Sequence, residues 1–282
     1  MKQVASLKYG VIFKKAFSQP DIFTAFVKAV LGIDLEIDIV ETEKSFKPII
    51  GKVDSRFDLF AQDKKNRIIV DIQHVRRSDH YDRFLHYHCT AMLEQIEKSD
   101  YYQPRLKVFT IVVLTSGDKH KVDVATIDFD PKDLNGNGLN EIPHKIIYLC
   151  PKYVNENTPV AYREWLEAID DTLDLEVDET HYHHAMIQKI FDSIEMDNIT
   201  PKERYDMFEE YGRREYEDRK KKYERFKNSH EMAMNSLAAG ISIELVSQIT
   251  GLTISEIETP FVMDEELDDD DDDGDGRSRP PQ

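Results

Sequence analysis

The chain has little of several features that would assign it to a familiar class. It contains two cysteines, too few for a disulfide framework or a four-cysteine zinc site, so reduced thiols are expected. No apolar stretch reaches the roughly 18 residues that a membrane span needs, and the start of the chain lacks the apolar core of a signal peptide. These absences argue against a disulfide-rich secreted domain and favour a cytoplasmic protein without a membrane partner.

Positive charge is also scarce. The chain has 55 acidic residues against 37 Lys and Arg, a net charge of −18. Residues 264–282 hold ten acidic residues and two arginines, so this tail accounts for −8 and residues 1–263 carry −10. The tail is too polar to fold. The acidic body argues against a passive, nonspecific DNA coat, but it allows a protein that grips nucleic acid through one basic face or through a bound metal.

What the chain does have is enough apolar residues for a sizeable core, about 40% of 282. The pattern predicts an α/β core over residues 1–150, a helical region over 151–260 and a disordered tail over 261–282. Helical spacing predicts two helices, or one broken at Pro20, over 11–31. Strands are predicted near 37–46, 52–61, 67–75, 107–115, 121–129 and 144–150, and helices near 78–98, 159–172, 180–196, 201–227, 231–239 and 242–258. The strand at 107–115 is apolar enough to be buried on both faces.

The segment that carries the chemistry is GKVDSRFDLFAQDKKNRIIVDIQH, which is typical of a β-hairpin. If the hairpin turns at its most polar point, DKKN, facing residues have numbers that sum to 129. Asp58 then lies opposite Asp71, and Arg56 lies opposite Gln73. Because side chains two apart share a face, these four are expected to project together. The apolar side chains expected on the other face are Val53, Phe57, Leu59, Val70 and Ile72.

Two directly opposed carboxylates destabilise a sheet. At about 5 Å and an effective dielectric near 20, their repulsion is on the order of 3 kcal/mol. A divalent cation such as Mg²⁺ or Mn²⁺ relieves this repulsion, because it prefers hard oxygen ligands. Two alternatives stay open: Arg56 neutralises the pair in a structural cluster, or the register is shifted by one residue.

The order of motifs resembles the PD-(D/E)XK nuclease superfamily: an Asp, a hairpin, then acid-x-Lys or acid-x-Gln on the second strand, then a helix. Over about residues 8–260 the chain is similar to the recombination-promoting nuclease and putative transposase family. The shared features are IFKKAF in the opening helix, the VDIQH strand, Arg83 and Tyr87 on the next helix, and ISIELVSQITGLTISEIE near the end. Asp71 stands where that family more often has Glu. Gln73 replaces the Lys of the wider superfamily and looks like this family's own variant.

The resemblance implies a restriction-endonuclease-like mixed sheet core flanked by helices, with a helical C-terminal region. It also implies that Asp58, Asp71 and the carbonyl of Ile72 hold Mg²⁺ or Mn²⁺, while Gln73 orients the attacking water. The implied catalytic residues are therefore Asp58, Asp71 and Gln73.

Four further residues are predicted to contact the substrate. Lys14 on the first helix and Arg83 on the helix after the hairpin are candidates for phosphate contact, and Arg56 and Tyr87 are expected beside them. For each cation, a plain surface charge or ion pair is an open alternative.

Two functions follow as hypotheses. The first is a metal-dependent DNA endonuclease, transposase-related or recombination-promoting, with DNA as its partner and homo-oligomerisation left open. The alternative is a catalytically silent nuclease relative that binds or assembles through its helical half. The short Asp71 side chain and the −10 body motivate the alternative.

Overall fold

The computed structural model describes residues 1–46, 55–75, 79–96 and 103–258. The chain divides into two compact units, Met1–Glu210 and Tyr211–Gln282. The boundaries predicted at residues 150 and 260 stay predictions, and the predicted acidic tail lies outside the described residues. Among the described helices, none combines the length and apolar character that a membrane crossing requires.

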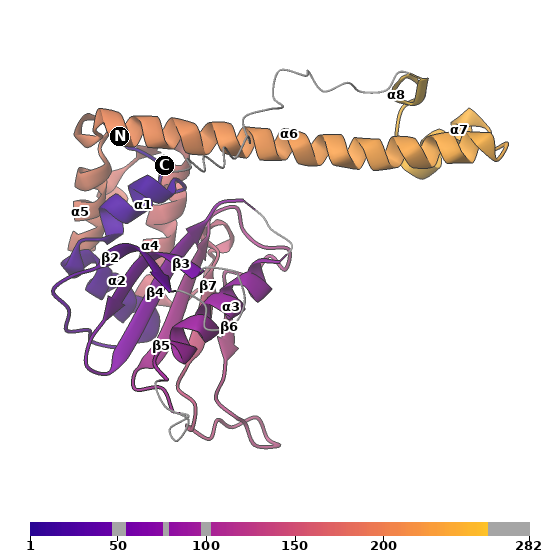
Figure 1. Cartoon of the computed structure of the whole chain (residues 1–282). Coiled ribbons are helices and arrows are strands. Elements are labelled where there is room, and N and C mark those ends of the chain that lie inside the picture. The colour runs from indigo at the N-terminus through magenta and orange to yellow at the C-terminus, as the bar shows by residue number, and fades with distance from the viewer. Residues whose placement is uncertain (47–54, 76–78, 97–102, 259–282) are drawn as a thin grey trace, which may run out of the picture. The chain divides into compact units, whose positions relative to one another are not determined.

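The first unit is built around a mixed six-stranded sheet with the order β2-β3-β4-β5-β7-β6 (Figure 1). β2, β3 and β4 are antiparallel neighbours, β4, β5 and β7 are parallel, and β6 runs antiparallel to β7. A two-stranded sheet joins β1 to β8. The strands are β1 Lys2–Gln3, β2 Glu41–Phe46, β3 Ser55–Gln62, β4 Asn66–Gln73, β5 Lys107–Leu114, β6 Val124–Asp128, β7 Lys145–Leu149 and β8 Glu176–Val177.

The strand predicted at 107–115 is confirmed as the centre of the sheet. β5 has parallel neighbours on both sides, and every residue from Val108 to Leu114 is buried. A nearly continuous apolar run suits this position because both faces of the sheet are covered.

Helices cover the two faces of the sheet with separate apolar cores. One core joins α1, α2, α4 and α5 to one face, and the other joins α3 to the opposite face. These helices are α1 Gly10–Phe17, α2 Pro20–Leu31, α3 His80–Leu93, α4 Val160–Asp171 and α5 Ala185–Ile194; short 3₁₀ turns lie at Pro151–Tyr153, Thr172–Asp174, Glu179–His181 and Met196–Asn198. The predicted break between the first two helices is confirmed, since α2 begins at Pro20, where a missing N–H costs nothing.

One helix is longer than predicted. α6 runs without interruption over Pro201–Ala238, where the sequence pattern indicates two helices, 201–227 and 231–239. The predicted break was wrong because residues 228–230 include neither Gly nor Pro, so nothing there interrupts the backbone hydrogen bonds. α6 ends shortly before Gly240, whose φ of 85° is the left-handed conformation that glycine tolerates.

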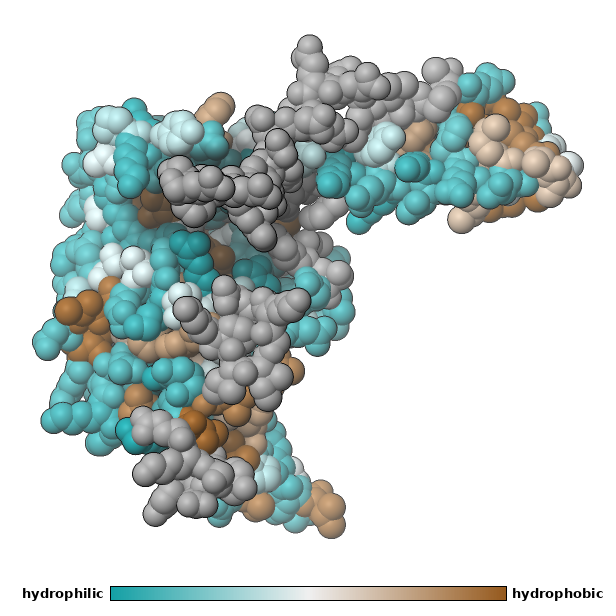
Figure 2. All heavy atoms as spheres, viewed as in Figure 1, coloured by the Kyte–Doolittle hydropathy of each residue, from teal (hydrophilic) through white to brown (hydrophobic). Residues whose placement is uncertain are grey.

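The second unit contains most of α6, from Tyr211 onward, followed by α7, Ile243–Thr250, and α8, Ile254–Glu258. Glu256 accepts hydrogen bonds from the backbone N–H and the hydroxyl of Thr253, so a capping box starts α8. Its small core consists of Ala233, Val246, Leu252 and Ile257. Figure 2 shows apolar side chains exposed at the α7 end of this unit. Leu245 and Ile249 on α7 are both exposed.

Candidate active site

The β3–β4 hairpin has the register that the sequence predicts. Gln62 pairs with Arg67 and Leu59 pairs with Val70, so facing residues sum to 129. A short turn fixes this register. In the turn, the Asp63 carboxylate accepts hydrogen bonds from the N–H groups of Lys65 and Asn66.

Beyond Leu59 and Val70, the next facing pair is Asp58 and Asp71. The N–H of Asp58 donates to Asp71 Oδ1 at 3.1 Å, and the N–H of Ile72 donates to Asp58 Oδ2 at 3.0 Å. At this point the two strands are joined by hydrogen bonds from backbone N–H groups to aspartate side chains. On its other side, β4 stays paired with β5 as far as Gln73. We call this end of the hairpin, Asp58 with Asp71, Ile72 and Gln73, the fork.

One predicted side-chain direction at the hairpin was wrong. Phe57 packs in the core under α3, whereas Leu59 and Val70 pack in the opposite core, with Ile72 partly buried beside them. Strict alternation places Phe57 and Leu59 on one face. The alternation fails next to Asp58 because the β2–β3 ladder is irregular there: Glu43, the residue in register with Asp58, has a φ of 56° and leaves the ladder. Val53, expected beside them, lies outside the described residues.

The fork keeps two carboxylates under electrostatic strain. Asp71 is only 4% exposed, and burial raises the pKa of its carboxyl well above the ordinary value; the charge of Asp58 raises it further. Burial also raises the pKa of Asp58, although the hydrogen bond from Ile72 opposes the change. Repulsion and burial together hold the two groups where a cation would stabilise both.

Two buried oxygens of the fork point to such a cation. Asp71 Oδ2 and Gln73 Oε1 have no hydrogen-bond partner among the described residues. The Gln73 amide is oriented by its own Nε2, which donates to the carbonyl of Val75 at 2.8 Å. Buried acceptors normally have partners, and leaving one unpaired costs roughly 1–3 kcal/mol. The residues therefore fit a hard divalent ion, which takes carboxylate, amide and carbonyl oxygens.

The fork has fewer acidic ligands than many metal sites. No cluster of three or more His, Cys, Asp or Glu suited to metal binding occurs in the described part of the chain. A metal at the fork would therefore rely on two carboxylates, neutral oxygens and water.

Cations from three elements lie near this pair. Lys14 on α1, Arg83 on α3 and Arg56 on β3 each lower the pKa of Asp58 by their positive charge, and Arg83 and Lys14 do so for Asp71. The structure thus brings together the three cations that the sequence predicts.

Their contacts differ. Arg83 lies over the Tyr87 ring, and its Nε donates to the Tyr87 hydroxyl at 3.3 Å. Tyr87 is 8% exposed and packs edge-on against Phe57 and Phe84. Its placement suits a residue that holds Arg83, and its predicted substrate contact stays a prediction.

One residue beside the fork was missed by the sequence analysis. The Glu43 carboxylate forms ion pairs with both Lys14 and Arg56. Its place opposite Asp58 depends on the pairing of β2 with β3, and the eight residues 47–54 separate these strands. No local turn signal fixes that register, so a residue-by-residue reading could find Glu43 only after the β2–β3 pairing was known.

The fold and the fork together are typical of one class of protein. The mixed sheet, the covering helices and the acidic hairpin make an α/β restriction-endonuclease-like fold. A family model for the PD-(D/E)XK nuclease family transposase matches residues 8–225, and the chain belongs to this family. The predicted resemblance is thereby confirmed, and nucleases of this class typically use divalent metal ions. No curated protein and no solved structure matched the chain.

Proposed function

We propose that the protein is a metal-dependent DNA endonuclease that hydrolyses phosphodiester bonds in a transposition-related or recombination-promoting role. One observation supports the proposal most directly. The buried Asp71 Oδ2 and Gln73 Oε1, which have no hydrogen-bond partner among the residues that the structure describes, lie in a fork with a second carboxylate, Asp58. The family membership supports a nuclease-related role. The two cysteines form no disulfide, which fits a reducing cytoplasm.

The fork would hold the metal through Asp58, Asp71 and the carbonyl of Ile72. In an extended strand the N–H and C=O of one residue point to the same side, and the Ile72 N–H points to Asp58. The neighbouring residue points the other way, since Thr115 donates to the carbonyl of Gln73. By this rule the Ile72 carbonyl would point to the side of β4 on which Asp58 lies. When bound, Mg²⁺ or Mn²⁺ would lower the pKa of a coordinated water and stabilise charge on the phosphate.

Gln73 would orient the attacking water. An amide has no useful pKa near neutrality, so it can accept or donate a hydrogen bond but cannot act as the base. Its Nε2 is engaged by Val75, which leaves Oε1 to accept a hydrogen bond from water.

The cations around the fork would bind the DNA backbone. Lys14, Arg56 and Arg83 place three positive charges near the carboxylates of a chain whose net charge is −18. Three cations gathered at one place in an acidic body favour engagement of DNA at the fork over coating of its length. Tyr87 would keep the Arg83 guanidinium in place.

The test is nicking of supercoiled plasmid by the purified chain with Mg²⁺ or Mn²⁺. We expect wild type to nick, and Asp58→Ala and Asp71→Ala to lose at least about three orders of magnitude in rate, roughly 4 kcal/mol. Asp63→Asn is the matched control, because Asp63 is an aspartate of the same hairpin whose carboxylate is bound by N–H groups.

The outcomes separate the hypotheses. Equal cleavage by the fork variants and wild type would reject the assignment. Mn²⁺ binding or DNA binding without any cleavage by wild type would instead support a catalytically silent relative.

A further inference from the structure

One carboxylate beside the fork bridges two cations that belong to different elements. Glu43 on β2 contacts the Lys14 ammonium of α1 through Oε1 and the Arg56 guanidinium of β3 through Oε2. The Lys14 side chain is 22% exposed and that of Glu43 is 34% exposed, so this pair is partly shielded from water. Both cations also lie near enough to Asp58 to lower its pKa.

The backbone at Glu43 is unusual. Its φ of 56° lies in the left-handed region, which a residue with a Cβ rarely adopts inside a strand. The β2–β3 ladder pairs Thr42 with Leu59 and Lys44 with Phe57, and the pair between them, Glu43 with Asp58, is missing. Rare backbone conformations persist where the surroundings hold them, and they concentrate at functional sites.

We propose that Glu43 occupies a phosphate-binding site formed by Lys14 and Arg56, and that a phosphate of the DNA backbone replaces it on binding. Two oxygens of one carboxylate, each bound to a different cation, match the arrangement that two non-bridging oxygens of a phosphate would adopt. The inference rests on the proposed function, because the incoming phosphate belongs to the substrate of the fork. Glu43 thus keeps two long side chains ordered in the free protein and competes with DNA for them.

If Glu43 competes with DNA for Lys14 and Arg56, its removal has a different effect from the removal of a purely structural residue. Removing the Glu43 charge frees two cations, so DNA should bind more tightly and release more counterions. Removing a contact that only supports the fold would instead weaken DNA binding or leave it unchanged.

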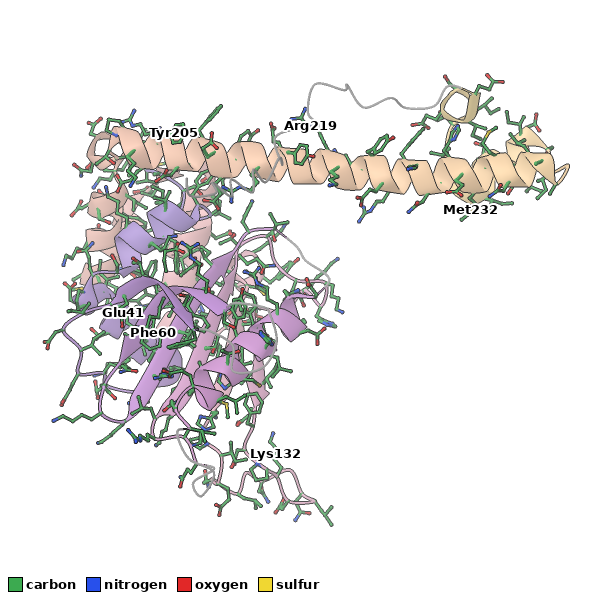
Figure 3. All side chains as sticks on the ribbon, in the orientation of Figure 1. Glu41, Phe60, Lys132, Tyr205, Arg219 and Met232 are labelled. Carbon is green, nitrogen blue, oxygen red and sulfur yellow. The ribbon has the colours of Figure 1, made fainter. Side chains whose placement is uncertain are left out.

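The matched control is Glu41, on the same strand. Glu41 pairs with Phe60 in the ladder, and its carboxylate contacts Lys44 at 2.8 Å. Figure 3 labels both Glu41 and Phe60. Neither Lys14 nor Arg56 is among its ion-pair partners in the described residues. Glu41→Gln therefore removes the same charge from β2 without touching the proposed phosphate site.

The experiment measures binding of a duplex oligonucleotide to the full chain in EDTA, where no cleavage occurs, over a range of salt concentrations. For Glu43→Gln we expect a Kd lower than that of Glu41→Gln by about 3–10-fold and a slope of log K against log[salt] steeper by about 1–2. A third variant, Glu43→Gln with Lys14→Gln, should lose about half of this extra slope. Thermal unfolding of each variant shows that it is folded.

Each result decides a different point. If Glu43→Gln binds like Glu41→Gln, or more weakly, the phosphate-site inference is overturned. If wild type binds the duplex but cleaves nothing with Mn²⁺, the nuclease proposal fails while the comparison of the two glutamate variants still decides the inference. If no variant binds the duplex, Lys14 and Arg56 do not form a DNA phosphate site and the inference is overturned.

Discussion

The two ends of the β3–β4 hairpin treat their aspartates in opposite ways. At the turn, the Asp63 carboxylate accepts hydrogen bonds from the N–H of Lys65 at 2.7 Å and from the N–H of Asn66 at 2.6 Å. Burial raises the pKa of Asp63, but these hydrogen bonds lower it more, and the result is below the ordinary value. At the fork, burial raises the pKa of both Asp58 and Asp71.

The supply of hydrogen-bond donors, and not the residue type, therefore decides whether an aspartate stabilises the hairpin or strains it. Asp63 accepts hydrogen bonds from two backbone N–H groups, so it stabilises the turn. Asp58 and Asp71 receive one backbone N–H each and face one another. A ligand that supplies positive charge would relieve the repulsion between these two carboxylates, and this relief would strengthen its binding.

Metal binding should show the largest contrast between the two ends. We expect Asp71→Asn to weaken Mn²⁺ binding at least 100-fold, about 2.7 kcal/mol, because it removes a charged ligand from the fork. Asp63→Asn should leave the affinity within about twofold. Isothermal titration calorimetry measures both, and similar losses for the two variants would remove the distinction between turn and fork.

The contrast also shows how far sequence alone can go. The opposition of Asp58 and Asp71 was predictable because a short polar turn fixes the register nearby. The buried β5 was predictable because its apolar run allows few other positions. The side of Phe57 and the role of Glu43 were not, because both depend on a backbone irregularity between strands that are joined by residues 47–54.

Removal of Gln73 should have the next largest effect. We expect Gln73→Ala to slow cleavage by one to two orders of magnitude, about 1.4–2.7 kcal/mol, with Mn²⁺ affinity nearly unchanged. The amide supplies a dipole that orients water, whereas the carboxylates supply the charge that binds the ion. Single-turnover rates and calorimetry separate the two effects. Loss of Mn²⁺ binding would make Gln73 Oε1 a metal ligand and the assigned role wrong.

Stability should change in opposite directions at the two ends. Without metal at pH 7, Asp71→Asn should raise the free energy of unfolding by about 1–2 kcal/mol, because the amide removes a buried charge and can donate to Asp58. Asp63→Asn should lower the free energy of unfolding by about 1–2 kcal/mol, because a neutral amide oxygen accepts weaker hydrogen bonds than a carboxylate does. Urea unfolding measures both, and a destabilised Asp71→Asn variant would contradict the strain at the fork.

Acid should erase the gain of Asp71→Asn. The folded-state pKa of Asp71 is raised above the ordinary 3.8, so the folded protein takes up this proton at a higher pH than the unfolded chain. The free energy of unfolding of wild type, relative to that of Asp71→Asn, therefore rises as the pH falls from that raised pKa towards 3.8. Below pH 3.8 the two proteins should be about equally stable. Urea unfolding between pH 7 and 3.5 tests the convergence. A constant difference would show that the Asp71 charge is not its cause.

The smallest effect is expected at Tyr87. It tests whether the Tyr87 hydroxyl contacts the substrate or only holds Arg83. Tyr87→Phe keeps the ring that packs against Phe57 and Phe84 and removes only the hydroxyl that accepts from Arg83. Because Arg83 also lies over the ring, it should stay near the carboxylates, and we expect a loss of about 2–5-fold in cleavage rate, under about 1 kcal/mol. Arg83→Gln is the reference variant and should lose more. If Tyr87→Phe lost as much rate as Gln73→Ala, the hydroxyl would contact the substrate directly, as the sequence resemblance implies, and the fork would extend onto α3.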